Sequence, residues 1–139
     1  MANTVQTSQR TTFLNVDLDL YSKMKLEPLV SALGDDVFPL FMGRERRLWS
    51  AHLELSEQAR TADAAIRRFC ALIHALPPAA RKLWDTAKTR DFNIGLQAGS
   101  VAEAREFKLS LPTIQSASSL NARIVITVYS FTFSPQACH

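Results

Sequence analysis

The sequence predicts an α+β domain in which a mixed, largely antiparallel sheet of about six strands carries its helices on one face. Three observations support this prediction. Apolar and polar residues alternate strictly in FLNVDLDLY, a long central stretch has apolar residues at helical spacing, and a strand–helix–strand order occurs near both ends of the chain. The two strand–helix–strand segments predict a split β-α-β, or ferredoxin-like, arrangement.

The chain of 139 residues is expected to hold a single domain. Residues 1–10 are polar and lack periodicity, which predicts a flexible arm; residues 11–133 form the domain, and residues 134–139 form a tail. The N-terminal residues lack the apolar core of a signal peptide, and no run approaches the roughly 20 apolar residues that span a bilayer. We therefore expect a cytoplasmic protein with no membrane partner.

The N-terminal half of the chain alternates short strands with a short helix. Pro39 places the second strand at an edge or a bulge, because proline cannot donate to a strand ladder. The first strand is expected to turn one set of residues to the core, namely Leu14, Val16, Leu18 and Leu20. The predicted elements are a strand over 13–21, a helix over 26–33 ending at Gly34, a strand over 37–42, a charged turn over 43–47 and a strand over 48–55.

The central stretch 61–87 predicts two helices that cover the sheet. Thr61 is the expected N-cap, and Pro77-Pro78 ends the first helix and begins the second. Alternation and turn residues then predict the remaining elements, which are a strand over 91–98, a strand over 106–111, a short helix over 113–120 ending at Asn121 and a strand over 123–133.

Acidic residues gather on the polar side of two predicted strands. Asp17 and Asp19 lie two residues apart on one strand, and His52 and Glu54 lie two apart on another, so each pair points one way. If the strands are neighbours, the pairs meet within about 5 Å. Three carboxylates and an imidazole suit a divalent metal or acid/base chemistry, which makes a hydrolase the alternative function. A solvated sheet face explains the same residues without any function.

The motifs of common catalytic sites do not occur in this sequence. It contains no G-x-S-x-G, no phosphate-binding G-x-x-x-x-G-K and no dinucleotide-binding G-x-G-x-x-G. Cys70 is expected to pack in the core, and Cys70 and Cys138 to be unpaired thiols of a reducing compartment. His74 is expected on a helix surface. We therefore assign no catalytic residue, no metal site and no cofactor.

The chain has 16 basic and 13 acidic residues, a net charge of +3. A nucleic-acid surface on the helices is an alternative, but aromatic residues do not interleave with the basic ones as stacking would require, so we do not expect nucleic acid as the partner. Phe131 and Phe133 leave two alternatives open, packing on a second subunit of a homodimer or on the core. The basic residues form three groups, namely Arg44, Arg46 and Arg47; Arg67 and Arg68; and Arg81, Lys82, Lys88 and Arg90.

Four stretches carry a resemblance to known proteins: NVDLDL, ADAAIRRF followed by LPPAARKLW, DFNIGLQAG and ARIVITVYSF. Over residues 12–131 the chain resembles a group of small uncharacterised bacterial α+β domains, several of which are similar to immunity proteins of toxin systems. That resemblance implies a protein that binds and blocks one cognate toxin, without chemistry of its own. It implies no particular functional residues.

We therefore expect a small binding or inhibitory protein of the immunity type, whose protein partner is a toxin. Arginine and tryptophan are frequent hot-spot residues in interfaces, and carboxylates complement a basic partner. The expected contact residues are those of the polar sheet face and of the charged turn, namely Asp17, Asp19, His52, Glu54, Arg44, Arg46, Arg47 and Trp49.

Overall fold

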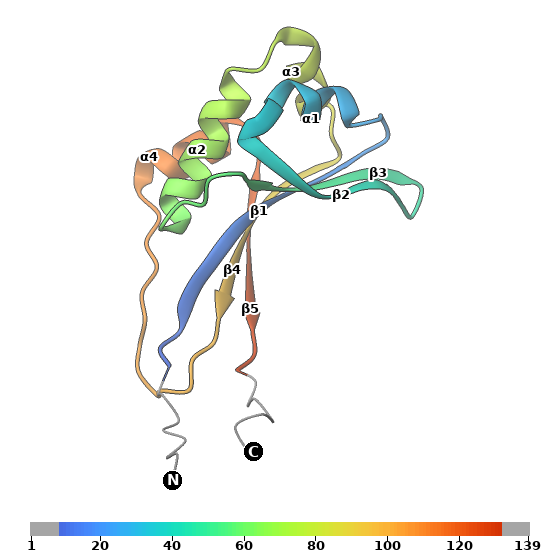
Figure 1. Cartoon of the computed structure of the whole chain (residues 1–139). Coiled ribbons are helices and arrows are strands. Elements are labelled where there is room, and N and C mark those ends of the chain that lie inside the picture. The colour runs from blue at the N-terminus through green and yellow to red at the C-terminus, as the bar shows by residue number, and fades with distance from the viewer. Residues whose placement is uncertain (1–8, 132–139) are drawn as a thin grey trace.

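The computed structural model describes residues 9–131, and Figure 1 shows the arrangement of its elements. Its strands are β1 (Thr12–Ser22), β2 (Val37–Glu45), β3 (Leu48–Leu55), β4 (Thr89–Gln97) and β5 (Arg123–Tyr129). Its helices are α1 (Glu27–Leu33), α2 (Ala62–His74), α3 (Pro78–Asp85) and α4 (Leu111–Ser119), with a short 3₁₀ turn at Gly34–Asp36. None of these helices combines the length and the apolar character needed to cross a membrane.

The strands form one mixed sheet, in the order β2-β3-β1-β4-β5. The pairs β2–β3, β1–β3 and β1–β4 are antiparallel, and β4–β5 is parallel. The α+β class is therefore confirmed, with five strands and four helices in residues 9–131. The expected strand over 106–111 is wrong. Residues 106–110 pair with no described strand and lead into α4, which begins at Leu111 (Figure 1).

Packing against helices explains why residues 106–111 look like a strand in sequence. Phe107 and Leu109 are partly covered while Glu106 and Lys108 are exposed, so burial alternates over these four residues as it does on a sheet. The Ser110 amide donates to an Asp63 carboxylate oxygen at 2.7 Å, which ties the segment to the first turn of α2. An extended chain shows period-two burial wherever one side is covered, whether or not its backbone joins a ladder.

The inward face of β1 is confirmed at three of its four expected positions. Val16, Leu18 and Leu20 are buried, but Leu14 is 44% exposed. The register of β1 on β4 shifts between Phe13 and Asn15, so Leu14 is the extra residue of a bulge. Phe13 packs against the core in its place.

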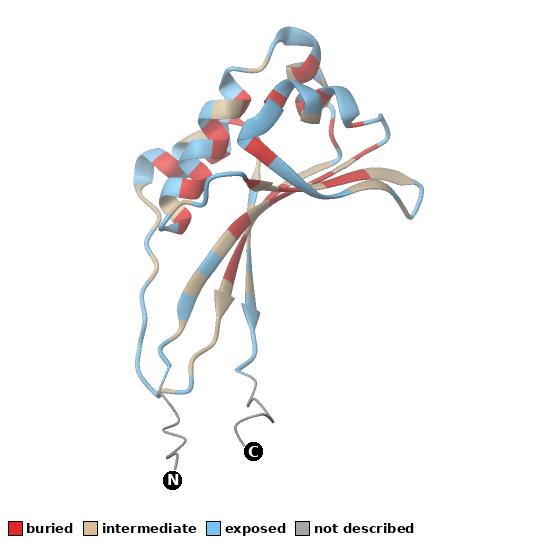
Figure 2. Cartoon of the chain, in the orientation of Figure 1, coloured by how far each residue is buried: buried red, intermediate tan, exposed pale blue. Residues whose placement is uncertain are grey.

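The four helices lie on one side of the sheet (Figure 1), and Figure 2 marks buried residues in both layers. Thr61 caps α2 as predicted, because its hydroxyl accepts from the Ala64 amide at 3.1 Å. Trp84 of α3 is fully buried, and its indole N–H donates to the Leu120 carbonyl at 3.0 Å. This bond satisfies the one polar group that the ring brings into the core.

The short helices end at residues with positive φ, as expected: Gly34 at 66° and Asn121 at 56°. The hairpin between β2 and β3 is tighter than expected, because β2 continues to Glu45 and only Arg46 and Arg47 form the turn. Outside the described residues lie most of the expected arm, the tail over 134–139, the end of the last predicted strand, Phe133, Cys138 and His139.

Candidate functional site

The sheet face opposite the helices carries the carboxylates that the sequence singles out. β1 and β3 are neighbours, and their register pairs Asp17 with Glu54 and Asp19 with His52. The strands therefore bring these four residues together. The sequence predicted this contact only on the condition that the two strands are neighbours. We call the group of Asp17, Asp19, Glu45, His52 and Glu54 the acidic cluster.

His52 stands at the centre of the acidic cluster. Its Nδ1 lies 2.7 Å from an Asp19 carboxylate oxygen, and its Nε2 lies 2.9 Å from an oxygen of Glu45. Burial disfavours the charged ring, but the hydrogen bonds to Asp19 and Glu45 outweigh it and raise the pKa of His52. An imidazolium donates from both nitrogens, so it satisfies both carboxylates at once. In this arrangement His52 bridges two anions and has no free nitrogen to accept a proton.

Glu45 belongs to the cluster although sequence analysis assigned it to a turn. It also accepts from the Ser50 hydroxyl at 2.9 Å, and the bonds from His52 and Ser50 lower its pKa. Arg46 and Arg47 have φ of 50° and 73°, the positive values of a two-residue hairpin turn normally made with Asn or Gly. Since the turn lacks those residues, no turn motif marks the register that brings Glu45 to His52.

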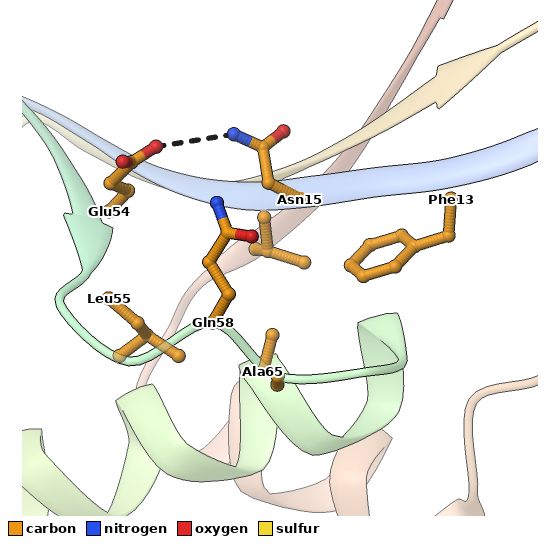
Figure 3. Close-up of a pocket in the computed structure, with 8 residues that line it drawn as sticks. Phe13, Asn15, Glu54, Leu55, Gln58 and Ala65 are labelled. Carbon is orange, nitrogen blue, oxygen red and sulfur yellow. Dashed lines mark hydrogen bonds between the residues drawn. The ribbon is translucent and has the colours of Figure 1, made fainter.

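Asp17 is a carboxylic acid of the cluster whose pKa is strongly raised. Burial is the main cause, and the negative charges of Asp19 and Glu54 add to it, so that the pKa of Asp17 rises to about 6. The Asn15 side-chain amide donates to Asp17 at 3.1 Å and to Glu54 at 3.4 Å, bridging the two acids. Figure 3 shows Asn15 reaching Glu54 across the two strands. The cluster therefore confines several carboxylates with few cations among them.

Aromatic residues of β1 and β2 border the cluster. The Tyr21 and Phe41 rings lie 5.6 and 5.9 Å from the His52 ring between centroids. Phe41 is 42% exposed, and Phe38, whose register partner is Glu54, is 57% exposed. Carboxylates beside exposed rings form a surface suited to cationic groups, which are attracted by both.

Arg44 and Trp49 do not join the acidic cluster. They are partners in the β2–β3 register, and Trp49 packs against the core on the helix side of the sheet. The Arg44 guanidinium lies 5.1 Å from the centre of the Trp49 ring, and the Lys25 ammonium lies 5.6 Å from it. Arg46 and Arg47 form the hairpin tip. The eight residues proposed from sequence therefore belong to two separate places.

Most of the helical basic residues have partners within the chain. Arg67 pairs with Asp63, Arg68 with Asp36, and Arg81 with Asp85. The guanidinium of Arg90 donates to the carbonyl of Trp84 in the last turn of α3, to that of Ala87 just after α3 and to that of Asn121 just after α4. These groups stabilise helices and helix ends.

The described residues offer little room for a small substrate at the cluster. The pocket between Asn15, Glu54 and Gln58 in Figure 3 has a volume of about 10 Å³, enough for about one water molecule. Among residues 9–131, no group of three His, Cys, Asp or Glu side chains is placed to hold a metal ion. Cys70 is buried as expected, and burial raises the pKa of its thiol to about 11.

Comparison with known proteins adds no relative: no family model matches the chain, and no curated protein or solved structure matches it.

Proposed function

We propose that this protein is a small binding protein of the immunity type, which neutralises a cognate bacterial toxin by covering it. The observation that carries the proposal is the acidic cluster, with its four carboxylates on one open sheet face of a chain whose net charge is +3. A patch opposite in sign to the whole molecule orients an approaching basic partner and speeds the correct encounter. In this role the protein acts in the cytoplasm, where it protects the cell that makes the toxin.

The partner that this face fits presents Lys or Arg side chains. Asp17 and Glu54 offer carboxylate oxygens, and Phe38 and Phe41 offer exposed rings beside them. Bidentate guanidinium–carboxylate pairs and cation–ring contacts are strong, directional interactions at protein interfaces. The carboxylates and rings of this protein are held on a rigid sheet, so they lose little conformational entropy when a partner binds.

The hairpin tip is a second candidate contact of the same partner. Arg46 and Arg47 both hold positive φ, which costs non-glycine residues of order 1 kcal/mol each. Backbone strain in non-glycine residues often accompanies a functional position. An arginine pair at the tip would contact acidic groups on the partner, while the cluster contacts basic ones.

We also infer that the sheet is an extended form of the split β-α-β, ferredoxin-like arrangement. Support comes from the strand order, in which β3 separates β1 from β2 and the helix α1 connects these two strands. β5 then adds one parallel strand beyond β4. Such folds host many unrelated functions, so this inference does not identify the partner.

The test is a binding and inhibition experiment with the partner that co-purifies from the source cells. The affinity of the wild type is measured by calorimetry at several salt concentrations, with Asp17→Asn/Asp19→Asn as the variant. We expect the variant to bind at least about tenfold more weakly, with a shallower salt dependence, because two complementary charges are lost. Toxin activity in the same mixture should recover in parallel.

Asp35→Asn/Asp36→Asn is the matched control, because it removes the same charge from an exposed turn away from the cluster. Equal weakening by both variants would show that only net charge matters and would contradict a specific role for the face. Full affinity of the cluster variant would contradict the proposal directly.

The alternative is an acid/base hydrolase, and the pKa of Asp17 favours it. A carboxyl with a pKa of about 6 is suited to donating a proton near neutral pH. Its partner base would have to be Glu54, because both nitrogens of His52 are occupied by carboxylates. Turnover of a substrate by the purified protein, lost in Asp17→Asn while the fold is kept, would establish this alternative and displace the binding role.

A further inference from the structure

The two edge strands of the sheet differ in their protection against pairing with another strand. β2 carries Pro39, which has no amide hydrogen, an irregular register beside it, and the charged residues Arg44 and Glu45. Such features block edge-to-edge association. β5 has no proline, and its one charged residue, Arg123, is held by two bonds to Asp91. Within residues 9–131, no strand pairs with the outer edge of β5.

The backbone groups on that outer edge can be assigned by alternation. The Tyr129 carbonyl accepts from the Ala98 amide at 2.8 Å, so the polar groups of Tyr129 point toward β4. Successive residues of a strand direct their N–H and C=O groups to opposite edges. Those of Ile124, Ile126 and Val128 therefore point outward. Ile126 and Val128 also have exposed side chains, at 62% and 57%.

The sequence of β5, RIVITVY, is self-complementary about its central residue. An antiparallel copy with Ile126 opposite Ile126 sets Ile124 opposite Val128 and brings branched apolar side chains together on one sheet face. The outward backbone groups of the two Ile126 residues then form a hydrogen-bonded pair. An interface of this kind uses the same patch on both molecules, as a two-fold axis requires.

The charges of β5 are compatible with this pairing. Arg123 of one copy lies opposite Tyr129 of the other, where a guanidinium is attracted by the ring face. The two Arg123 residues stand at opposite ends of the paired strands, six positions apart, which is roughly 20 Å at the rise of an antiparallel strand. At that separation their repulsion is screened in physiological salt.

We propose that β5 pairs antiparallel with β5 of a second copy, about a two-fold axis through Ile126, so that the two sheets become continuous. The paired strands cover less than the roughly 800 Å² per partner of a standard interface. The dimer is therefore expected to exchange with monomer on dilution. The open faces of both copies, with their acidic clusters, stay uncovered in this assembly, so the dimer is independent of the proposed function.

The experiment measures the mass of the full chain by light scattering over a dilution series, using charge reversal at Ile126. Because Ile126 faces itself, Ile126→Lys and Ile126→Glu each place like charges together, and each alone is expected to weaken dimerisation at least about tenfold. An equimolar mixture of the two places opposite charges together and is expected to restore the dimer. Leu40→Lys, at a 49% exposed site on β2, is the matched control and should leave dimerisation unchanged.

Three results would overturn the proposal. A wild type that stays monomeric over the whole series excludes the proposed dimer. If the Ile126 amide is protected from hydrogen exchange in that monomer, other residues of the same chain cover the outer edge of β5. A dimer that both charged variants retain places the interface elsewhere. Failure of the mixture to recover while both variants remain folded contradicts pairing of Ile126 with itself.

Discussion

The two faces of the sheet are made by alternate residues of the same strands, yet different interactions act on them. Toward the helices, Leu18, Leu53 and Phe92 are fully buried. On the opposite face, Asp17, His52 and Asn93 occupy neighbouring positions and are half-buried in a hydrogen-bonded network. The apolar face gains stability from removing hydrocarbon from water, whereas the polar face holds like charges together at a cost.

The comparison shows that the open face lowers the stability of the fold, whereas the apolar face raises it. A solvated sheet face needs only scattered polar residues, and lone lysines or threonines would serve. Instead burial, together with the nearby negative charges of Asp19 and Glu54, raises the pKa of Asp17 to about 6. Natural proteins retain such costs mainly at functional positions, which is the physical basis for expecting a partner here.

Truncating one aromatic residue on each face is expected to give the largest contrast. Phe92→Ala removes a fully buried ring that packs on Phe69 at 5.7 Å, and should lower the free energy of unfolding by about 3–5 kcal/mol. Phe41→Ala, at a 42% exposed ring, should lower it by less than about 1 kcal/mol. Urea titration of both variants provides the measurement. Comparable losses would show that the open face is part of the core.

The second prediction has the opposite sign: Asp17→Asn is expected to raise the free energy of unfolding. The folded pKa of Asp17, about 6, lies above its ordinary value of 3.8, so the folded state binds the proton more tightly. The wild type therefore loses stability as the pH rises from about 4 to about 6. Asn should recover about 1 kcal/mol above pH 6, after allowance for solvent screening, and nothing below pH 4.

Chemical denaturation of Asp17→Asn at pH 3.5 and pH 7 separates this effect from a general one. Asp35→Asn, at an exposed acid away from the cluster, should stay within about 0.5 kcal/mol of the wild type at both values. If Asp17→Asn were destabilising at pH 7, its hydrogen bond from Asn15 would outweigh the repulsion, and the cluster would be structural.

The smallest effect is expected at His52. Burial lowers the pKa of His52, but the bonds to Asp19 and Glu45 outweigh burial and raise it. The contribution of protonated His52 to the stability of the fold is therefore complete below its ordinary pKa of 6.5, and it disappears as the pH rises through the raised pKa. His52→Gln should remove this dependence and cost less than about 1 kcal/mol at pH 6. Glu45→Gln should give part of the same change. Denaturation midpoints between pH 6 and 8 measure both, and an unchanged slope in His52→Gln would contradict the imidazolium bridge.

Local pattern predicted much of the fold because it records which side of each element is covered. Alternation identified the inward residues of β1 from Val16 onward, and the spacing of apolar residues identified α2 and α3. The same signal failed at 106–111, where helices cover one side of an extended segment that pairs with no described strand. It also failed at Leu14, because a bulge shifts the face by one residue.

The sequence by itself determined the chemistry of this protein's open face: the types and spacing of Asp17, Asp19, His52 and Glu54 place two pairs on two strands. Only the tertiary structure decided that those strands are neighbours, and that Glu45 reaches His52 across a turn of two arginines. The reason is that side-chain periodicity is set within each strand, whereas strand order and register depend on pairing between residues far apart in the chain.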